Sequence, residues 1–171
     1  MQRVLVLVVF LGLLSFPLMA QDYPKAEIFG GYQYLRLGGD LGDLNANGWN
    51  VSLTGNFNNW FGVAGDFSGT YKTVSGVSGH VYSYTGGPVV SLNSGGKVNP
   101  FVHALFGGSN FGGGGGSSIN AFTMMFGGGA DVKVARALAI RLFQADWVYY
   151  RNAGVGESKN VRISTGIVFR F

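Results

Sequence analysis

The chain has 171 residues, of which only 12% are charged, while 15% are aromatic and 30 are glycines. A soluble globular domain usually carries about 25% charged residues, so this composition indicates an apolar outer surface. The net charge of +4 comes from dispersed residues that form no basic patch, which argues against a nucleic-acid partner. The absence of cysteine excludes disulfides, lipidated cysteine and thiolate metal sites.

The first 20 residues are typical of a secretory signal peptide. Arg3 precedes the apolar run Val4–Leu14, which is followed by Pro17 and by a small residue at Ala20. The apolar run is shorter than the ~20 residues of a membrane-spanning helix, so a membrane anchor is the weaker alternative. We therefore expect cleavage after Ala20, which leaves residues 21–171 as one exported domain.

The exported part consists of runs in which apolar residues alternate with small or polar residues. The last run, "VRISTGIVFRF" (Val161–Phe171), has aliphatic and aromatic residues at odd positions and Arg162 and Arg170 at even positions. Such period-two alternation predicts strands with two chemically different faces. We find eight such runs: Lys25–Arg36, Gly48–Phe57, Trp60–Tyr71, Gly79–Leu92, Pro100–Gly108, Ile119–Lys133, Leu138–Tyr150 and Asn160–Phe171.

The number and length of these runs predict an all-β fold, an eight-stranded antiparallel up-and-down transmembrane β-barrel. A strand of about 11 residues, tilted by about 45°, spans roughly the ~25 Å apolar band of an outer-membrane barrel. Asn58 and Asn59 suit a tight hairpin, because Asn tolerates positive φ. The longer connections are expected to face outward at residues 37–47, 72–78, 109–118 and 151–159.

A secreted soluble β-sandwich would show the same alternation, with the apolar face as its core. Two features favour the barrel. The non-apolar face is rich in Gly, Ser, Thr and Asn rather than Lys and Glu. Aromatic residues also gather near strand ends, as an interfacial girdle requires: Tyr32, Tyr34, Trp49, Trp60, Tyr71, Tyr82, Tyr84, Trp147 and Tyr149.

Two strands have an ambiguous phase. In the seventh, Trp147 and Tyr149 share the parity of Arg141, so either a bulge near residues 143–145 shifts the phase or both aromatics point inward. The fifth strand is apolar on both faces. We place Val102, Ala104 and Phe106 outward and His103 inward.

On the last strand, the even-numbered residues would line the barrel interior. On the other strands, the polar face of each alternating run would do the same. The interior of an eight-stranded barrel is just filled by side chains, and buried charges need partners, so we expect a polar plug. In particular, Glu27 should pair with Arg162 or Arg170 across the closure. The small residues Gly31, Gly62, Ala64 and Gly166 keep a narrow pore as an alternative. The candidate interior residues are Glu27, Asp66, Asp131, Lys133, Arg141, Arg162 and Arg170.

The segments "NPFVHALFGG", "FGGGADV", "AIRLFQADW" and the terminal "VRISTGIVFRF" resemble those of small eight-stranded outer-membrane barrels, the outer-membrane protein A-like and opacity-type β-barrel domains. The resemblance covers essentially the whole mature chain and includes no periplasmic domain. It implies location in the outer membrane of a Gram-negative-type bacterium, contact with outer-membrane lipid, and a monomer.

The resemblance also implies a role for the last strand, which the outer-membrane assembly machinery reads in this family. The corresponding alternate positions are Ile163, Thr165, Ile167, Phe169 and Phe171. The implied function is structural or surface-interacting, with a narrow pore as the alternative.

A third, weaker alternative is a lipid-modifying enzyme, because Ser78 and His80 share one strand face. Their order is the reverse of the His-x-Ser of lipid A deacylases, and no carboxylate is placed to orient His80. We therefore expect no catalytic residue, no cofactor and no metal site.

Overall fold

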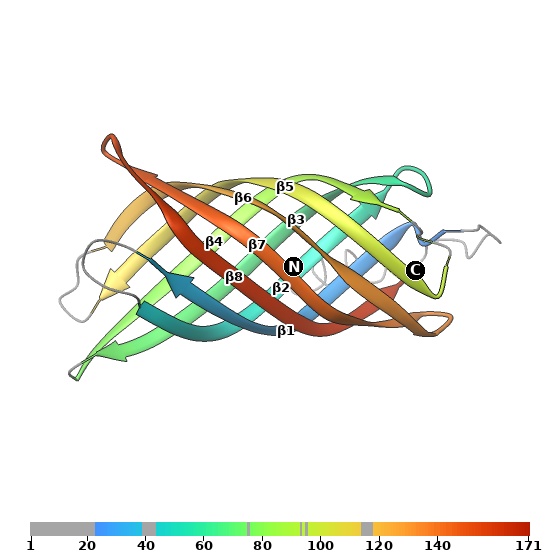
Figure 1. Ribbon diagram of the computed structural model, residues 1–171, viewed down its shortest axis with the longest axis horizontal. Coiled ribbons are helices and arrows are strands. Elements are labelled where there is room, and N and C mark those ends of the chain that lie inside the picture. The colour runs from blue at the N-terminus through green and yellow to red at the C-terminus, as the bar shows by residue number, and fades with distance from the viewer. Residues whose placement is uncertain (1–22, 39–43, 75, 93, 95, 114–117) are drawn as a thin grey trace, which may run out of the picture.

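The computed structural model of the chain is a closed barrel of eight antiparallel strands (Figure 1). It describes residues 23–38, 44–74, 76–92, 94, 96–113 and 118–171, so the expected signal peptide lies outside the described residues. The strands are β1 (Ala26–Leu37), β2 (Leu44–Asn56), β3 (Phe61–Val74), β4 (Val77–Ser91), β5 (Val98–Gly113), β6 (Ser118–Ala135), β7 (Leu138–Asn152) and β8 (Val155–Arg170). Each strand pairs with its neighbours in sequence, and β8 closes on β1, which confirms the predicted fold class.

The alternation in sequence becomes an inside and an outside. On β8, Arg162 is 1% exposed, whereas its neighbour Ile163 is 47% exposed. The same inversion holds on β2, where Asn50 is buried and Val51 lies on the surface. The charged and most of the polar side chains lie in the interior beside smaller apolar clusters, and large apolar side chains cover the exterior. The soluble sandwich is therefore wrong, and the apolar exterior requires hydrocarbon around it.

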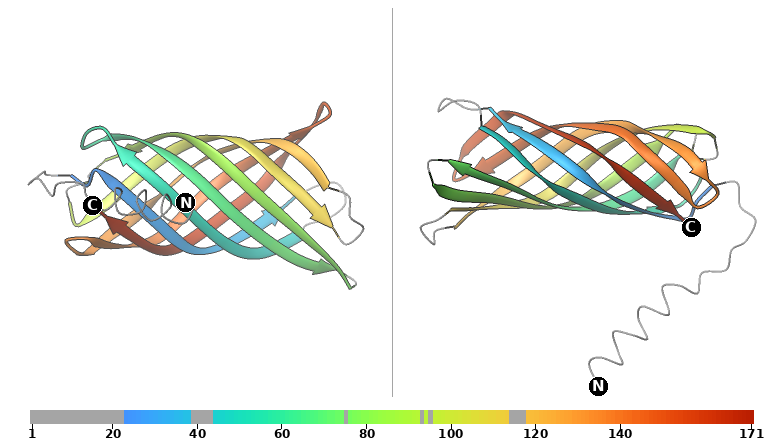
Figure 2. Two further views of the ribbon diagram at one scale, coloured as in Figure 1. Left: turned by 180° about the vertical axis from the view of Figure 1, so that it is seen from behind. Right: turned by 90° about the horizontal axis from the view of Figure 1, so that it is seen from below.

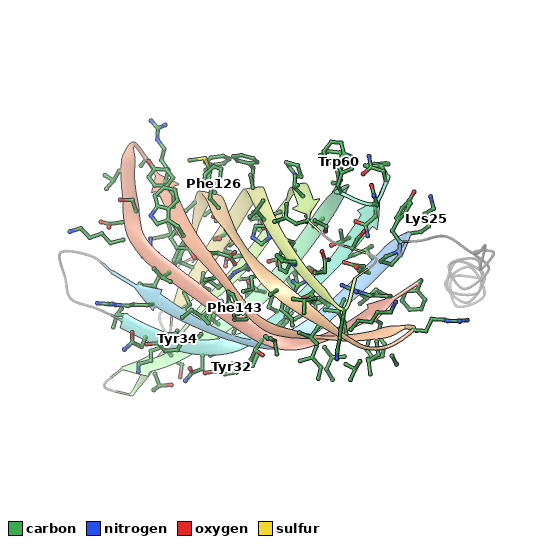
Figure 3. The ribbon with its side chains drawn as sticks, turned by 45° about the vertical axis from the view of Figure 1, so that its right-hand side comes forward. Lys25, Tyr32, Tyr34, Trp60, Phe126 and Phe143 are labelled. Atoms are coloured by element: carbon green, nitrogen blue, oxygen red, sulfur yellow. The ribbon has the colours of Figure 1, made fainter. Side chains whose placement is uncertain are left out.

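The barrel has two distinct rims. The C-terminus, the start of β1 and the connections at residues 57–60 and 136–137 lie at one end, which we call the terminal rim (Figure 2). The C-terminal ends of β1, β3 and β5 and the turn at Ala153 and Gly154 lie at the opposite end, which we call the loop rim. Aromatic side chains lie on the exterior near both rims, with Tyr32 and Tyr34 towards the loop rim and Trp60 towards the terminal rim (Figure 3). This arrangement fits the two interfacial girdles of a membrane barrel.

Most strands are longer than predicted, and most of the extra length lies at the loop rim. β5 continues to Gly113 instead of ending at Gly108, and β8 begins at Val155 instead of Asn160. Much of the predicted outward loops at 37–47, 72–78, 109–118 and 151–159 is therefore strand, apart from 39–43, 75 and 114–117, which lie outside the described residues. Beyond the membrane both faces of a strand are polar, so alternation vanishes while the backbone ladder continues.

Two turns show how the chain reverses. Neither Asn58 nor Asn59 adopts positive φ, so the reason given for a tight hairpin there is wrong. Instead, the Asn58 Oδ1 atom accepts hydrogen bonds from the backbone N–H groups of Trp60 and Phe61 at 2.9 and 2.7 Å, which is a side-chain-capped turn. At the loop rim, Ala153 and Gly154 link β7 to β8 with φ of 45° and 88°.

The two ambiguous strands are resolved. On β7 the register shifts between Arg141 and Gln144, and a bulge there leaves both Leu142 and Phe143 exposed. Trp147 consequently points outward, as the bulge alternative required. On β5, Val102 and Phe106 lie outside while the His103 side chain is buried, as predicted. Among the described residues, no helix is long and apolar enough to cross a membrane.

The Ala153–Gly154 turn yields a stability prediction. A hairpin turn with positive φ at both central residues favours Asn-Gly. Most other residues carry a Cβ that makes positive φ strained. Ala153→Asn should therefore raise the free energy of unfolding of the refolded barrel by about 0.5–1 kcal/mol, measured by urea titration in phospholipid vesicles. Ala153→Val should lower it, because a β-branched residue tolerates positive φ poorly. Equal effects of the two substitutions would contradict this turn geometry.

Candidate functional site: the charged interior

The barrel interior contains a central ion-pair group. Arg162 on β8 reaches across to β3, where its Nη1 atom lies 2.7 Å from Asp66 Oδ1. Its Nε atom lies 2.7 Å from Asp146 Oδ2 on the adjacent strand β7. Asp66 also accepts a hydrogen bond from Asn50 Nδ2 at 2.8 Å. One guanidinium therefore bridges two carboxylates from opposite sides of the barrel.

His103 extends this group to β5. Its Nε2 atom lies 2.7 Å from Asp146 Oδ1, and both side chains are almost completely buried. Gln144 Nε2 donates a further hydrogen bond of 2.8 Å to Asp146 Oδ2. Asp146 is therefore the centre of the group, although the sequence did not identify it. Its parity places it outside unless the bulge between Arg141 and Gln144 is known.

A second ion-pair group lies closer to the terminal rim. The Arg141 guanidinium contacts both Asp131 oxygens, with Nε–Oδ1 and Nη2–Oδ2 distances of 2.8 and 3.1 Å. Arg170 lies between two carboxylates, with Nε 3.1 Å from Glu27 Oε1 and Nη2 3.7 Å from Asp131 Oδ2. The Arg170–Glu27 contact is an ion pair without hydrogen-bond geometry. It joins β8 to β1, as the predicted closure requires.

Gln144 connects the two groups. Its Oε1 atom accepts a hydrogen bond of 2.7 Å from Arg141 Nη1, while its amide nitrogen donates to Asp146. The interior charges of the described barrel thus form one network from Glu27 to Asp66. In a network of this kind, each buried charge keeps partners that replace its lost hydration.

Aromatic rings and glycines complete the packing around Arg141. Its guanidinium carbon lies 4.3 Å from the ring centres of both Phe29 and Phe101, so the cation is held between two aromatic faces. A Cβ on Gly31 would lie 2.8 Å from Phe29 Cζ, and one on Gly129 would lie 3.0 Å from Phe101 Cζ. These glycines therefore give room to the rings that pack against Arg141.

The interior towards the loop rim is filled by uncharged side chains. Ser109 Oγ forms hydrogen bonds of 2.7 Å with Ser83 Oγ and with Thr123 Oγ1. Apolar residues that include Leu105, Met125 and Val148 pack in a cluster across this part of the barrel. A cavity of about 20 Å³ lies among residues that include Glu27, Asp66 and His103, which is room for about one water molecule.

The predicted candidate residues are distributed as follows. Glu27, Asp66, Asp131, Arg141, Arg162 and Arg170 are all buried in the interior. Lys133 was expected there and is instead exposed, because it lies two residues before the end of β6 at the terminal rim. Of the proposed small interior residues, Gly31 and Gly166 pair directly across the β1–β8 closure.

The Ser78 and His80 side chains each contact a different neighbour. Ser78 Oγ lies 3.1 Å from Thr73 Oγ1, and the His80 ring packs against Tyr82 with ring centres 4.9 Å apart. Within the described part of the chain, no group of three or more His, Cys, Asp or Glu residues is placed to hold a metal ion.

Solved structures with the same architecture come from several bacteria. Neisserial surface protein A superposes with a TM-score of 0.73 at 14% identity, covering 86% of this chain and 97% of its own. Ail, the attachment invasion locus protein of Yersinia pestis, has a TM-score of 0.58 at 25% identity, covering 87% and 99%. The N-terminal β-barrel domain of Pseudomonas aeruginosa OprF has a TM-score of 0.55 at 13% identity, covering 86% and 98%.

No protein-family model matches the chain, and no curated protein matches its sequence significantly. The likenesses to neisserial surface protein A and OprF are too remote in sequence to speak for more than the fold. Together with the apolar exterior, the aromatic girdles and the filled polar interior, they define the class: the chain is a small eight-stranded β-barrel of the bacterial outer membrane.

The central ion-pair group yields a stability prediction. Arg162→Met would leave Asp66 and Asp146 buried with fewer partners, so it should lower the free energy of unfolding by about 3–5 kcal/mol. Lys159→Met is the matched control, because Lys159 lies on the same strand and is exposed. Its effect should stay within about 0.5 kcal/mol. Equally small effects in urea titrations of both variants would mean that water solvates the interior charges.

Proposed function

We propose that the protein is a structural and surface-interacting barrel, neither an enzyme nor a pore. The observation that carries this proposal is the continuous ion-pair network that fills the interior from Glu27 to Asp66. A conducting lumen needs a connected aqueous path, and the small cavity beside this network holds about one water molecule. The contacts of Ser78 and His80 with Thr73 and Tyr82 give no support to a lipid-modifying reaction.

Planar-bilayer recordings test the plug against the narrow pore. The purified barrel should give no step-like conductance, because the guanidiniums of Arg141 and Arg162 and their carboxylate partners occupy the lumen. The Arg162→Ser/Asp146→Ser variant serves as the comparison. It removes the side chains at the centre of the network and should conduct measurably more than the native chain. Regular conductance steps from the native chain would refute the plug and support the pore.

The proposed route to the membrane follows from the termini. We propose export by residues 1–20, the terminal rim in the periplasm, and insertion as a monomer by the assembly machinery, which reads Ile163, Thr165, Ile167, Phe169 and Phe171. The exposed side chains of Ile163, Ile167, Phe169 and Phe171 on the lipid-facing surface of β8 support this reading. The Phe171 backbone also closes the barrel, because its N–H donates to Ala26 O at 2.9 Å and its C=O accepts from Lys25 N at 2.6 Å.

Deleting Phe171 would therefore remove closing hydrogen bonds together with the side chain, so a substitution tests the assembly role more cleanly than a deletion. Phe171→Ser removes the exposed ring and keeps the backbone. It should lower outer-membrane levels in cells several-fold and leave protein in the periplasm, while urea titration of the refolded barrel changes by less than about 1 kcal/mol. Native surface levels of Phe171→Ser would contradict the assembly role.

The loop rim is the proposed contact surface. β6 has 18 residues, which at a tilt of about 45° correspond to roughly 42 Å, well beyond the ~25 Å apolar band. Figure 1 shows the β3–β4 and β7–β8 hairpins projecting at the end away from the C-terminus. The described part of this rim exposes basic side chains on four strands: Arg36, Lys72, Arg151 and Lys159. Such a rim suits an anionic partner.

The chemistry of that partner is suggested by one of the similar structures. Ail has been solved in complex with the heparin analogue sucrose octasulfate. We therefore propose that the loop rim of this chain binds sulfated or otherwise anionic polysaccharide at the cell surface. The supporting observations are the exposed cations of β1, β3, β7 and β8 and the likeness to Ail, which is 25% identical.

Calorimetric titration with sucrose octasulfate tests this binding. The double variant Arg151→Gln/Lys159→Gln should bind roughly tenfold more weakly, a loss of about 1.4 kcal/mol, and added salt should weaken the native interaction. Lys133→Gln/Arg136→Gln is the matched control, because both residues are exposed on the opposite rim. Equal losses in the two double variants would assign the binding to net charge rather than to the loop rim.

A further inference from the structure

Two groups can be distinguished among the outward-facing glycines of the barrel. In the first group, an aromatic ring of the neighbouring strand lies over the glycine. A Cβ on Gly69 would lie 3.0 Å from atoms of both Trp49 and Tyr82, and one on Gly108 would lie 2.8 Å from Tyr84 Cζ. His80 and Tyr149 cover Gly112 and Gly156 in the same way. These rings restore the apolar cover that a glycine lacks.

Gly65 and Gly86 belong to the second group and have no such cover. They are directly paired between β3 and β4. A Cβ on Gly65 would meet no atom within 4 Å, and one on Gly86 would meet only backbone, Ala64 O at 3.2 Å and Gly65 Cα at 4.0 Å. The nearby Tyr84 ring leans sideways over Gly108 of β5 and leaves the paired glycines open. The result is a bare floor of backbone on the lipid-facing surface.

Large apolar side chains wall this floor and turn it into a groove. Leu53 pairs with Gly65 from the β2 side, and Phe106 pairs with Gly86 from the β5 side. Phe67 and Tyr84 form the wall towards the loop rim, and the lining also includes Val51. The lining side chains that face outward are therefore hydrocarbon, apart from the phenol oxygen of Tyr84.

The position of the groove along the membrane normal determines whether lipid or water covers it. On β3, Gly65 lies between Phe61 at the terminal rim and Tyr71, which belongs to the aromatic girdle towards the loop rim. The groove therefore opens into the apolar band and not to water. Its floor is one inter-strand spacing wide, about 4.8 Å between the two glycine strands, which is comparable with the width of one extended hydrocarbon chain.

We propose that this groove binds a single acyl chain of a membrane phospholipid, held between Leu53 and Phe106 on the floor formed by Gly65 and Gly86. The groove continues the lipid-facing surface, so its occupant is drawn from the bilayer. A second copy of the chain fits less well, since a specific protein interface usually buries about 1,200–2,000 Å², far more than this groove offers.

Native mass spectrometry tests the proposal. The mature barrel is refolded into vesicles of phosphatidylethanolamine and phosphatidylglycerol with palmitoyl and oleoyl chains, then released into mild detergent. The native chain should retain one phospholipid. Gly65→Leu places a side chain in the groove, where the Cβ position has no atom within 4 Å, and should reduce retention at least several-fold. Gly30→Leu is the matched control, because Gly30 also faces outward with no atom near its Cβ position and lies outside the groove.

The results of this experiment distinguish a bound phospholipid from an empty groove and from a second copy of the chain. Equal retention by Gly65→Leu and the native chain, or no retained lipid on the native chain, would overturn the proposal. A native dimer that Gly65→Leu dissociates would assign the groove to a second copy and would overturn it as well. If Gly65→Leu does not refold, Leu53→Ala serves instead, since removal of one wall should also lower retention, and unchanged retention would again refute the acyl chain.

Discussion

The structure depends on one constraint: in hydrocarbon, every backbone N–H and C=O group must find its partner within the protein. Eight strands that close β8 onto β1 meet this constraint along their whole paired length. Closure also determines which kind of side chain each position needs, because alternate residues point either to lipid or into a narrow interior. The exposed Ile163 and the buried Arg162 on adjacent positions of β8 are the direct consequence.

The narrow interior then determines how charge is accommodated. An eight-stranded barrel leaves space for side chains and little else, so each buried carboxylate lies against a cation. Asp146 joins Arg162 to His103, and Gln144 passes the network on to Arg141. Glycines on β1 and β6 provide the volume for the two rings that enclose Arg141. Charge and packing are thus settled together, which supports the proposal of a filled interior.

Much of this architecture follows from sequence, and the exceptions have physical causes. Period-two alternation identifies all eight strands, because strict alternation fixes the facing of each residue. It puts Glu27, Arg162 and Arg170 on the inner face, and the structure shows that Arg170 is the partner of Glu27. The inward facing of Asp146 was not predicted, because a bulge at Leu142 and Phe143 inverts the alternation of β7 beyond it. The positions of the strand ends at the loop rim were not predicted, because alternation weakens where neither face of a strand contacts lipid. Rings that lie over glycines, such as Tyr84 over Gly108, depend on cross-strand register, which alternation alone does not give.

The central claim is that the apolar face of the barrel is in contact with lipid. Nitroxide labels placed one at a time along β8 from residue 161 to residue 169, in barrels refolded into phospholipid vesicles, measure it directly. Labels at the odd positions should be strongly accessible to oxygen dissolved in the bilayer, and labels at the even positions should be shielded, with a period of two. Odd positions that are shielded from oxygen, or accessible to a water-soluble relaxant instead, would contradict the membrane barrel.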